Sequence, residues 1–222
     1  MVYSMFDIIG PNMIGPSSSH TAGALKIALL AYKMMKHPIK KVKFILYGSF
    51  ARTYQGHGTD RALLSGILGF REDDARIRDS FEWAKKTKIE YEFQINTDRN
   101  DFHPNTVEIF VWDEQEKKMV IRGESIGGGA ARIVQINQVD VALTGDYPTL
   151  LIQQKDEPGV LAYITQCLNK FHINIATVKL YRENKGKMAY TIIETDEKIP
   201  EDALILLEQC SQIATVQFLT VS

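Results

Sequence analysis

The densest run of polar side chains lies near the start of the chain, directly before a segment with helical spacing. The run consists of three serines, a histidine and a threonine, namely Ser17, Ser18, Ser19, His20 and Thr21. The first backbone N–H groups of a helix have no partner within it, and the helix dipole favours a negative charge there. One hydroxyl suffices to cap a helix. The run therefore predicts a binding site for a carboxylate or a phosphate, and a simple N-cap is the alternative interpretation.

A histidine between two glycines forms another cluster. His57 stands between Gly56 and Gly58, just before a predicted helix that Thr59 or Asp60 can cap. Because its neighbours carry no side chains, the imidazole can approach a substrate as a base or as a hydrogen-bond partner. A glycine-rich turn with an exposed histidine explains the same pattern, and the residues alone favour neither interpretation.

A third polar motif places His103 and Asn105 on either side of Pro104. Proline restricts the residue before it to extended backbone, which would hold His103 in one orientation beside a substrate. A polar turn that leads into a strand from Val107 is the interpretation that the residues alone favour.

A glycine-rich motif follows at residues 125–129, with the sequence Ser-Ile-Gly-Gly-Gly. Glycines permit positive φ angles and a close approach of the backbone to another group. The motif lacks the Gly-Lys-Ser/Thr ending of a phosphate-binding P-loop. A tight bend between two strands is therefore the preferred interpretation.

The elements that position these motifs indicate an α+β protein whose first part is mixed α/β. Helical spacing extends from the serine run to about residue 35 and recurs over 59–70 and 74–86, whereas strands are predicted at 42–47, 89–95, 107–112, 119–125 and 131–136. Helices therefore cluster early and strands late, which favours α+β over a repeating βαβ fold. No Gly-x-Gly-x-x-Gly follows the first predicted strand, which argues against a dinucleotide-binding fold.

The rest of the chain predicts a smaller domain of its own. Gly145 and Pro148 punctuate the chain, so we expect domains at residues 1–146 and 147–222. Beyond this boundary the pattern is β-α-β-β-α-β, with strands at 149–153, 173–181, 188–194 and 216–221 and helices at 160–171 and 200–209. This order is that of a ferredoxin-like split βαβ sandwich.

The composition is that of an ordinary globular protein and excludes several classes of function. The 222 residues include 26 basic and 27 acidic side chains, and this net charge of −1 gives no basic excess for a nucleic-acid partner. No apolar run approaches the roughly 18 residues of a membrane span. Met1–Gly10 lacks the basic patch and the long apolar core of a secretory signal. We therefore expect a cytoplasmic protein with no nucleic-acid and no membrane partner.

Taken together, the four motifs resemble one family, the bacterial iron–sulfur-dependent L-serine dehydratases, and within it the β chain of the two-subunit type. The segment from Gly15 to Gly23 resembles the family's signature, and the other motifs follow in the expected order. The N-terminal domain is similar to the allosteric substrate-binding domain of some phosphoglycerate dehydrogenases. The C-terminal domain resembles an ACT domain, a small regulatory module that often binds amino acids, and its Asp156-x-Pro158-Gly159 turn falls where ACT domains place a ligand-binding loop.

The resemblance implies deamination of L-serine to pyruvate and ammonia. It implies a [4Fe–4S] cluster that acts as a Lewis acid on the serine hydroxyl, a polar cradle for the substrate carboxylate, and a base that removes the Cα proton. It also implies a regulatory ligand on the ACT domain, for which L-serine is the simplest choice. The catalytic candidates are His57, as first choice for the base, His20 and His103; the substrate-binding candidates are Ser17, Ser18, Ser19, Thr21, Thr59, Asp60 and Asn105; the regulatory-ligand candidates are Asp156, Pro158 and Gly159.

The cysteine count bears on where the cluster is held. A [4Fe–4S] cluster usually takes about four thiolates, and the sequence has only Cys167 and Cys210, neither of them near the motifs. We therefore expect the L-serine dehydratase α chain, a separate partner, to ligate the cluster, and this chain to hold no metal and to be inactive alone. Self-association through the ACT domain is also expected. The alternative is a free-standing amino-acid-binding regulatory protein, and a phosphate-binding enzyme is a weaker third interpretation.

Overall fold

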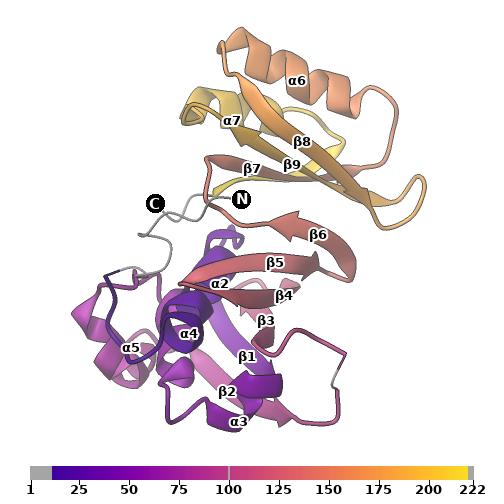
Figure 1. Ribbon diagram of the computed structural model, residues 1–222. Helices are drawn as coiled ribbons and strands as arrows, with labels where there is room; N and C mark the ends of the chain where they lie inside the picture. Colours follow the sequence, from indigo (N-terminus) through magenta and orange to yellow (C-terminus); the bar gives the residue numbers. More distant parts are fainter. Residues whose placement is uncertain (1–11, 100, 220–222) are drawn as a thin grey trace. The chain divides into compact units, whose positions relative to one another are not determined.

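The computed structural model describes residues 12–99 and 101–219 of the chain. The chain forms two compact units, which divide between Asn137 and Gln138 (Figure 1). The predicted domain boundary, between residues 146 and 147, stays a prediction. In the part of the chain that the structure describes, no helix is long and apolar enough to cross a membrane.

The first unit begins with helices and continues into a mixed sheet. Its helical segments are η1 (Ser18–Gly23), a π-helical turn, followed by α2 (Ala24–Lys33), α3 (Gly48–Thr53), α4 (Thr59–Ile67), the 3₁₀ turn η2 (Ala75–Asp79) and α5 (Ser80–Lys86). The strands are β1 (Ile39–Tyr47), β2 (Glu90–Asn96), β3 (Thr106–Asp113), β4 (Lys118–Gly127) and β5 (Ala130–Ile136), and within this unit they form a sheet in the order β2-β1-β3-β4-β5. Strands β1 and β2 pair in parallel, and β1–β3, β3–β4 and β4–β5 pair antiparallel.

Alternation along the strands decides which face of this sheet is buried. Val42, Phe44 and Leu46 of β1 are fully buried, whereas the residues between them are only partly so. Successive strand residues point to opposite faces of a sheet, so these three side chains share one face. Helix α2 contacts β3, β4 and β5, and α4 packs on α2, as Figure 1 shows. The core of the unit therefore lies between the sheet and these two helices.

The second unit begins with the short strand β6 (Val139–Leu143), and after it come elements in the predicted β-α-β-β-α-β order. They are β7 (Thr149–Lys155), α6 (Val160–Lys170), β8 (Ile175–Arg182), β9 (Met188–Thr195), α7 (Glu201–Glu208) and β10 (Ile213–Leu219). The sheet order is β10-β7-β9-β8 and its neighbours are antiparallel, so β9 lies between the two strands that α6 connects. A separate core, which includes Ile152, Ile164, Ile193 and Leu207, is buried in this unit.

Sequence patterns predicted an α+β protein whose first part is mixed α/β, and the two sheets with their helices confirm that the chain mixes α and β structure. Two elements were missed, α3 and β6. Helix α3 spans six residues, too few for a helical period to show. The single helix predicted over residues 74–86 is in fact the 3₁₀ turn η2 followed by α5.

Candidate functional site

In the serine run, Ser17 caps the helix, whereas Ser18 and Ser19 are partly exposed. Ser17 has extended backbone at the start of η1, and its Oγ accepts a hydrogen bond from the backbone N–H of His20 at 3.1 Å. The hydroxyls of Ser18 and Ser19 are partly exposed and have no partner among the described residues. The N-cap interpretation therefore accounts for Ser17 alone, and two hydroxyls are left open at the start of the helix.

Thr21 joins this helix start to the glycine–histidine loop. Its side chain is buried, and its hydroxyl donates to the carbonyl of His57 at 3.0 Å. Two motifs that lie 36 residues apart in the sequence are thus held together by one hydrogen bond. Because the Thr21 hydroxyl donates its proton to that carbonyl, it has no second proton to donate to a ligand.

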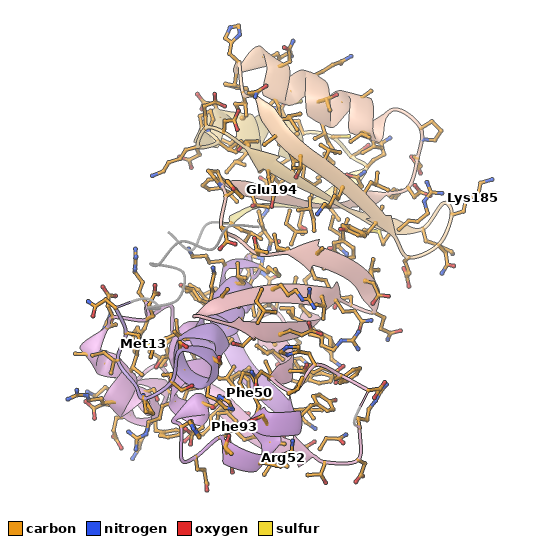
Figure 2. All side chains as sticks on the ribbon, viewed as in Figure 1. Met13, Phe50, Arg52, Phe93, Lys185 and Glu194 are labelled. Carbon is orange, nitrogen blue, oxygen red and sulfur yellow. The ribbon has the colours of Figure 1, made fainter. Side chains whose placement is uncertain are left out.

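The histidine rings of the two motifs are in contact, tilted against each other. The ring centroids of His20 and His57 are 4.7 Å apart, and the rings are tilted by 31°. Phe50 packs its ring against His20 edge to face at 5.4 Å; Figure 2 marks Phe50 with Arg52 on α3. Burial, and to a smaller extent the charge of His57, lowers the pKa of His20 below its usual value. His20 is therefore biased toward its neutral form.

The hydrogen bonds of His57 leave one ring nitrogen open. Its Nδ1 lies 3.4 Å from the carbonyl oxygen of Thr53, which can only accept, so this long contact requires the proton on Nδ1. The Nε2 atom has no partner among the residues that the structure describes. A neutral His57 in this tautomer presents the Nε2 lone pair, which is the form that a general base needs.

Ser49 connects this pair to the third motif. Its Oγ lies 2.9 Å from Nε2 of His20, and its backbone N–H donates to the carbonyl of Pro104 at 2.6 Å. The ring of His103 turns to its own loop, where Nδ1 accepts the backbone N–H of Asn105 at 3.2 Å. The structure thus brings the loop of His103 to the histidine pair, although the His103 ring itself bonds within its loop.

Ser125, in the glycine-rich motif, joins the first and third motifs. Its hydroxyl donates to the carbonyl of Ser19 at 2.8 Å, and its backbone N–H donates to the carbonyl of Asn105 at 3.0 Å. Beyond it, three consecutive glycines with positive φ form the predicted tight bend between β4 and β5. The side-chain Oδ1 of Asn105 is buried and has no hydrogen-bond partner in the described part of the chain.

Thr59 and Asp60 begin α4 directly after the His57 loop. Thr59 is fully buried, and its hydroxyl is without a partner among the described residues. Asp60 accepts the backbone N–H of Arg61 at 2.8 Å, and burial raises the pKa of its carboxyl. Among the described residues neither side chain forms a hydrogen bond with the other motifs, and their predicted part in substrate binding stays a prediction.

The regulatory-ligand candidates lie together in the second unit. Oδ2 of Asp156 accepts the backbone N–H of Gly186 at 2.9 Å, and Oδ1 lies 3.3 Å from a guanidinium nitrogen of Arg182. Gly159 adopts φ +90° directly before α6. With Pro158 and Lys185, which projects from the β8–β9 hairpin (Figure 2), they line a hollow of about 440 Å³. The β7–α6 loop and this hairpin therefore form one small concave surface.

The described side chains do not fit a [4Fe–4S] cluster. Cys167 is buried in α6 and Cys210 is partly buried after α7, so both thiols belong to the second unit. Across residues 12–99 and 101–219, no group of three or more His, Cys, Asp or Glu side chains is arranged to hold a metal ion. Such a cluster usually needs about four thiolates.

Comparison with known proteins shows the family of the chain. The model of the serine dehydratase beta chain family matches residues 2–135. The chain belongs to that family. It is 40% identical over 220 residues to the "L-serine dehydratase, beta chain" of Peptoniphilus asaccharolyticus, covering 99% of both chains. It is 39% identical over 213 residues to the "Probable L-serine dehydratase, beta chain" of Bacillus subtilis strain 168, covering 96% of both.

A further relative is longer than this chain. The D-3-phosphoglycerate dehydrogenase of Bacillus subtilis strain 168 is 26% identical over 198 residues, which are 87% of this chain and 37% of that protein. The likeness agrees with the predicted similarity of the first domain to a part of some phosphoglycerate dehydrogenases. The matched part covers more of this chain than the first unit alone contains.

Sequence reasoning missed Ser49 and Thr53, which contact the two histidine rings. A glycine directly before Ser49, after an alternating strand, was the available signal, because it marks a sharp change of direction. It could indicate a turn but not which side chain the turn would present.

Proposed function

We propose that this chain is the β subunit of an L-serine dehydratase, which converts L-serine to pyruvate and ammonia. The observation that carries the proposal is the contact of the His20 and His57 rings, with Nε2 of His57 open, next to the uncommitted hydroxyls of Ser18 and Ser19 in the same helix start as His20. The names of the full-length relatives support the same activity. A binding protein would need the hydroxyls but not an open imidazole nitrogen.

The substrate carboxylate binds at the start of η1 in this proposal. The hydroxyls of Ser18 and Ser19 are open, and the first amides of a helix have no partner within it. The helix dipole adds a favourable interaction with a negative charge. The buried Oδ1 of Asn105, which lacks a partner among the described residues, accepts an N–H of the substrate ammonium group. Carboxylate and ammonium are thus bound by different motifs, which orients the Cα–H bond.

His57 then acts as the base. Its open Nε2 takes the Cα proton, the Cα–Cβ double bond forms, and the C–O bond breaks with its electron pair on the β-oxygen. A bound Lewis acid would stabilise the departing hydroxide, and the proton held by His57 converts it to water. The product is aminoacrylate, which becomes an imine and is hydrolysed to pyruvate and ammonia. His20 stays neutral beside His57 and so does not oppose the positive charge that His57 gains. The [4Fe–4S] cluster that the resemblance implies is assigned here to a separate α chain, because the described side chains of this chain do not fit it.

We further propose that the second unit is an ACT module that regulates the enzyme. Its strand order and its concave surface at Asp156, Pro158 and Gly159 support an amino-acid effector, with L-serine as the first choice. An effector carboxylate would meet the uncapped start of α6, and its ammonium group would meet the Asp156 carboxylate. Self-association of the ACT module is part of the same proposal.

The proposal is tested by reconstitution. This chain is co-expressed with the α chain from the same genome, the cluster is reconstituted without oxygen, and pyruvate release from L-serine is measured, with each chain alone as a control. Pyruvate from the mixture alone is the expected result. If no mixture forms pyruvate but L-serine raises the melting temperature of this chain, the enzyme proposal is wrong and the free-standing regulator replaces it.

A further inference from the structure

Ser49 supplies the side-chain partner of the His20 ring. The distance from its Oγ to Nε2 of His20 is 2.9 Å, and within the described residues no other hydrogen bond reaches either ring nitrogen of His20. We propose that Ser49 is a positioning residue, whose hydroxyl donates to Nε2 and holds His20 in its neutral Nδ1–H tautomer. The Nδ1–H group is then free to donate to the substrate carboxylate. That last step rests on the proposed function, whereas the choice of tautomer does not.

The backbone of Ser49 is held on both sides. Its N–H donates to the Pro104 carbonyl at 2.6 Å, and its carbonyl accepts the hydroxyl of Thr53 at 2.9 Å. Gly48, before it, has φ +54°, and a Cβ there would lie 2.5 Å from the Pro104 oxygen. Only glycine allows the two segments to approach so closely. The position of the Ser49 Cβ is therefore set by the β1–α3 junction, not by the histidine that it contacts.

The direction of the hydrogen bond follows from the donors and acceptors present. A hydroxyl has one proton to donate, and Nε2 of His20 is the only partner of the Ser49 hydroxyl among the described residues. If Nε2 carried the proton, the hydroxyl would accept it, and the O–H of the partly exposed Ser49 would have only solvent as an acceptor. If Nε2 carries the lone pair, the same contact satisfies the hydroxyl proton. The latter arrangement is the one in which His20 is neutral with its proton on Nδ1.

The remaining contacts of His20 make this tautomer useful. Its backbone N–H donates to Ser17, and its ring contacts the ring of Phe50 edge to face and the tilted ring of His57. These contacts leave rotation of the ring as the main freedom, and the bond to Ser49 removes it. Burial lowers the pKa of His20, which agrees with a ring kept neutral. A neutral neighbour also lets His57 gain a proton without facing a second charge.

The test begins with the full chain, without the partner and without turnover. Long-range ¹H–¹⁵N spectra of the histidine rings report which nitrogen of His20 carries the proton. The wild type should show the Nδ1–H tautomer. Ser49→Ala should shift His20 toward the Nε2–H form, which predominates in free histidine, and Ser49→Thr, which keeps a hydroxyl, should restore Nδ1–H. Ser65→Ala is the matched control, because Ser65 is a buried serine of α4 with no partner among the described residues.

The assembled enzyme provides the other measurement. Loss of the bond in Ser49→Ala should lower kcat by about 10- to 100-fold, with partial recovery in Ser49→Thr and none of the loss in Ser65→Ala. A wild-type spectrum with the proton on Nε2 overturns the proposal, and so does a Ser49→Ala spectrum equal to that of the wild type. If no assembled enzyme forms pyruvate but the spectra behave as expected, the dehydratase proposal fails and the assignment of Ser49 stands.

Discussion

The His20 ring lies in surroundings that disfavour its charged form. Burial is the larger cause and the charge of His57 is the smaller, and both lower the pKa of His20 from its usual 6.5. In the unfolded chain neither cause is present. Between the lowered pKa and about 6.5, the unfolded chain therefore binds more protons at this position than the folded chain, and stability rises with pH there.

The difference in the pKa of His20 between the folded and the unfolded chain predicts a loss of stability on acidification that this one residue causes. As pH falls through about 6.5, His20 should lower the free energy of unfolding, and its effect should level off below its own folded pKa. His20→Asn should remove this contribution and flatten the profile. The measurement is urea denaturation of the full chain at a series of pH values. His172→Asn, at an exposed histidine of the second unit, is the control and should keep the wild-type profile. An unchanged profile in His20→Asn would refute the interpretation.

Residue types singled out motifs that the structure brings together, but the roles of those residues stay predictions and depend on contacts that no pattern shows. The serine run, His57 and the His103 loop do come together, through hydrogen bonds of Thr21, Ser49 and Ser125. Ser17 and Ser18 are the same type of residue. Ser17 is the cap because the helix begins directly after it, and the sequence does not show that starting point. Ser49 could not be selected, because its partner lies 29 residues away and pairs with it only after β1 and α3 have formed.

At the scale of elements, two glycines support the loops that carry the site. Both Gly48 and Gly58 have positive φ, but they differ in their surroundings. A Cβ on Gly48 would meet the Pro104 backbone at 2.5 Å, whereas a Cβ on Gly58 would meet nothing within 4 Å. Comparing Gly48 with Gly58 therefore separates the cost of the left-handed backbone from the cost of the close packing between the start of α3 and the His103 loop.

The pair gives a prediction for stability. Gly58→Ala should lower the free energy of unfolding by about 1–2 kcal/mol, the cost of left-handed backbone for an L-residue. Gly48→Ala should cost that and a further ~1–3 kcal/mol, because the chain must move to relieve the clash. Chemical denaturation of the full chain measures both. Gly56→Ala, whose Cβ would meet only the Thr53 oxygen at 3.7 Å, should be nearly neutral. Equal losses for Gly48→Ala and Gly58→Ala would contradict the proposed contact.

Element types were predictable where a period was long enough to show. The alternation of β1 and the order of the second unit's elements both appear in the sequence. The pairing of β1 with β2 and with β3 could not be predicted from the sequence, because sheet neighbours depend on contacts between distant segments. Helix α3 was missed for a related reason: its six residues depend on the close approach of Gly48 to Pro104 rather than on a hydrophobic period.

At the scale of the whole molecule, the proposed regulation concerns the second unit. If L-serine binds the concave surface beside Asp156, it should shift the backbone NMR signals of the β7–α6 loop and of the β8–β9 hairpin. Asp156→Asn should abolish those shifts, because it removes the charge that binds the ammonium group and weakens the contact with Arg182. Asp196→Asn is the control, since Asp196 lies in the same unit and bonds to Asn174 instead. Shifts that persist in Asp156→Asn would exclude this loop as the effector site.

The central claim is that this chain contributes the base while another chain holds the cluster. The most direct measurement compares His57→Ala with the wild type in the enzyme assembled with its α chain, at saturating L-serine, with assembly and bound L-serine measured on the same samples. We predict that assembly and binding are retained and that pyruvate release falls by about 10²- to 10⁴-fold, the contribution of a positioned base. Turnover close to that of the wild type in an assembled His57→Ala enzyme would contradict the account.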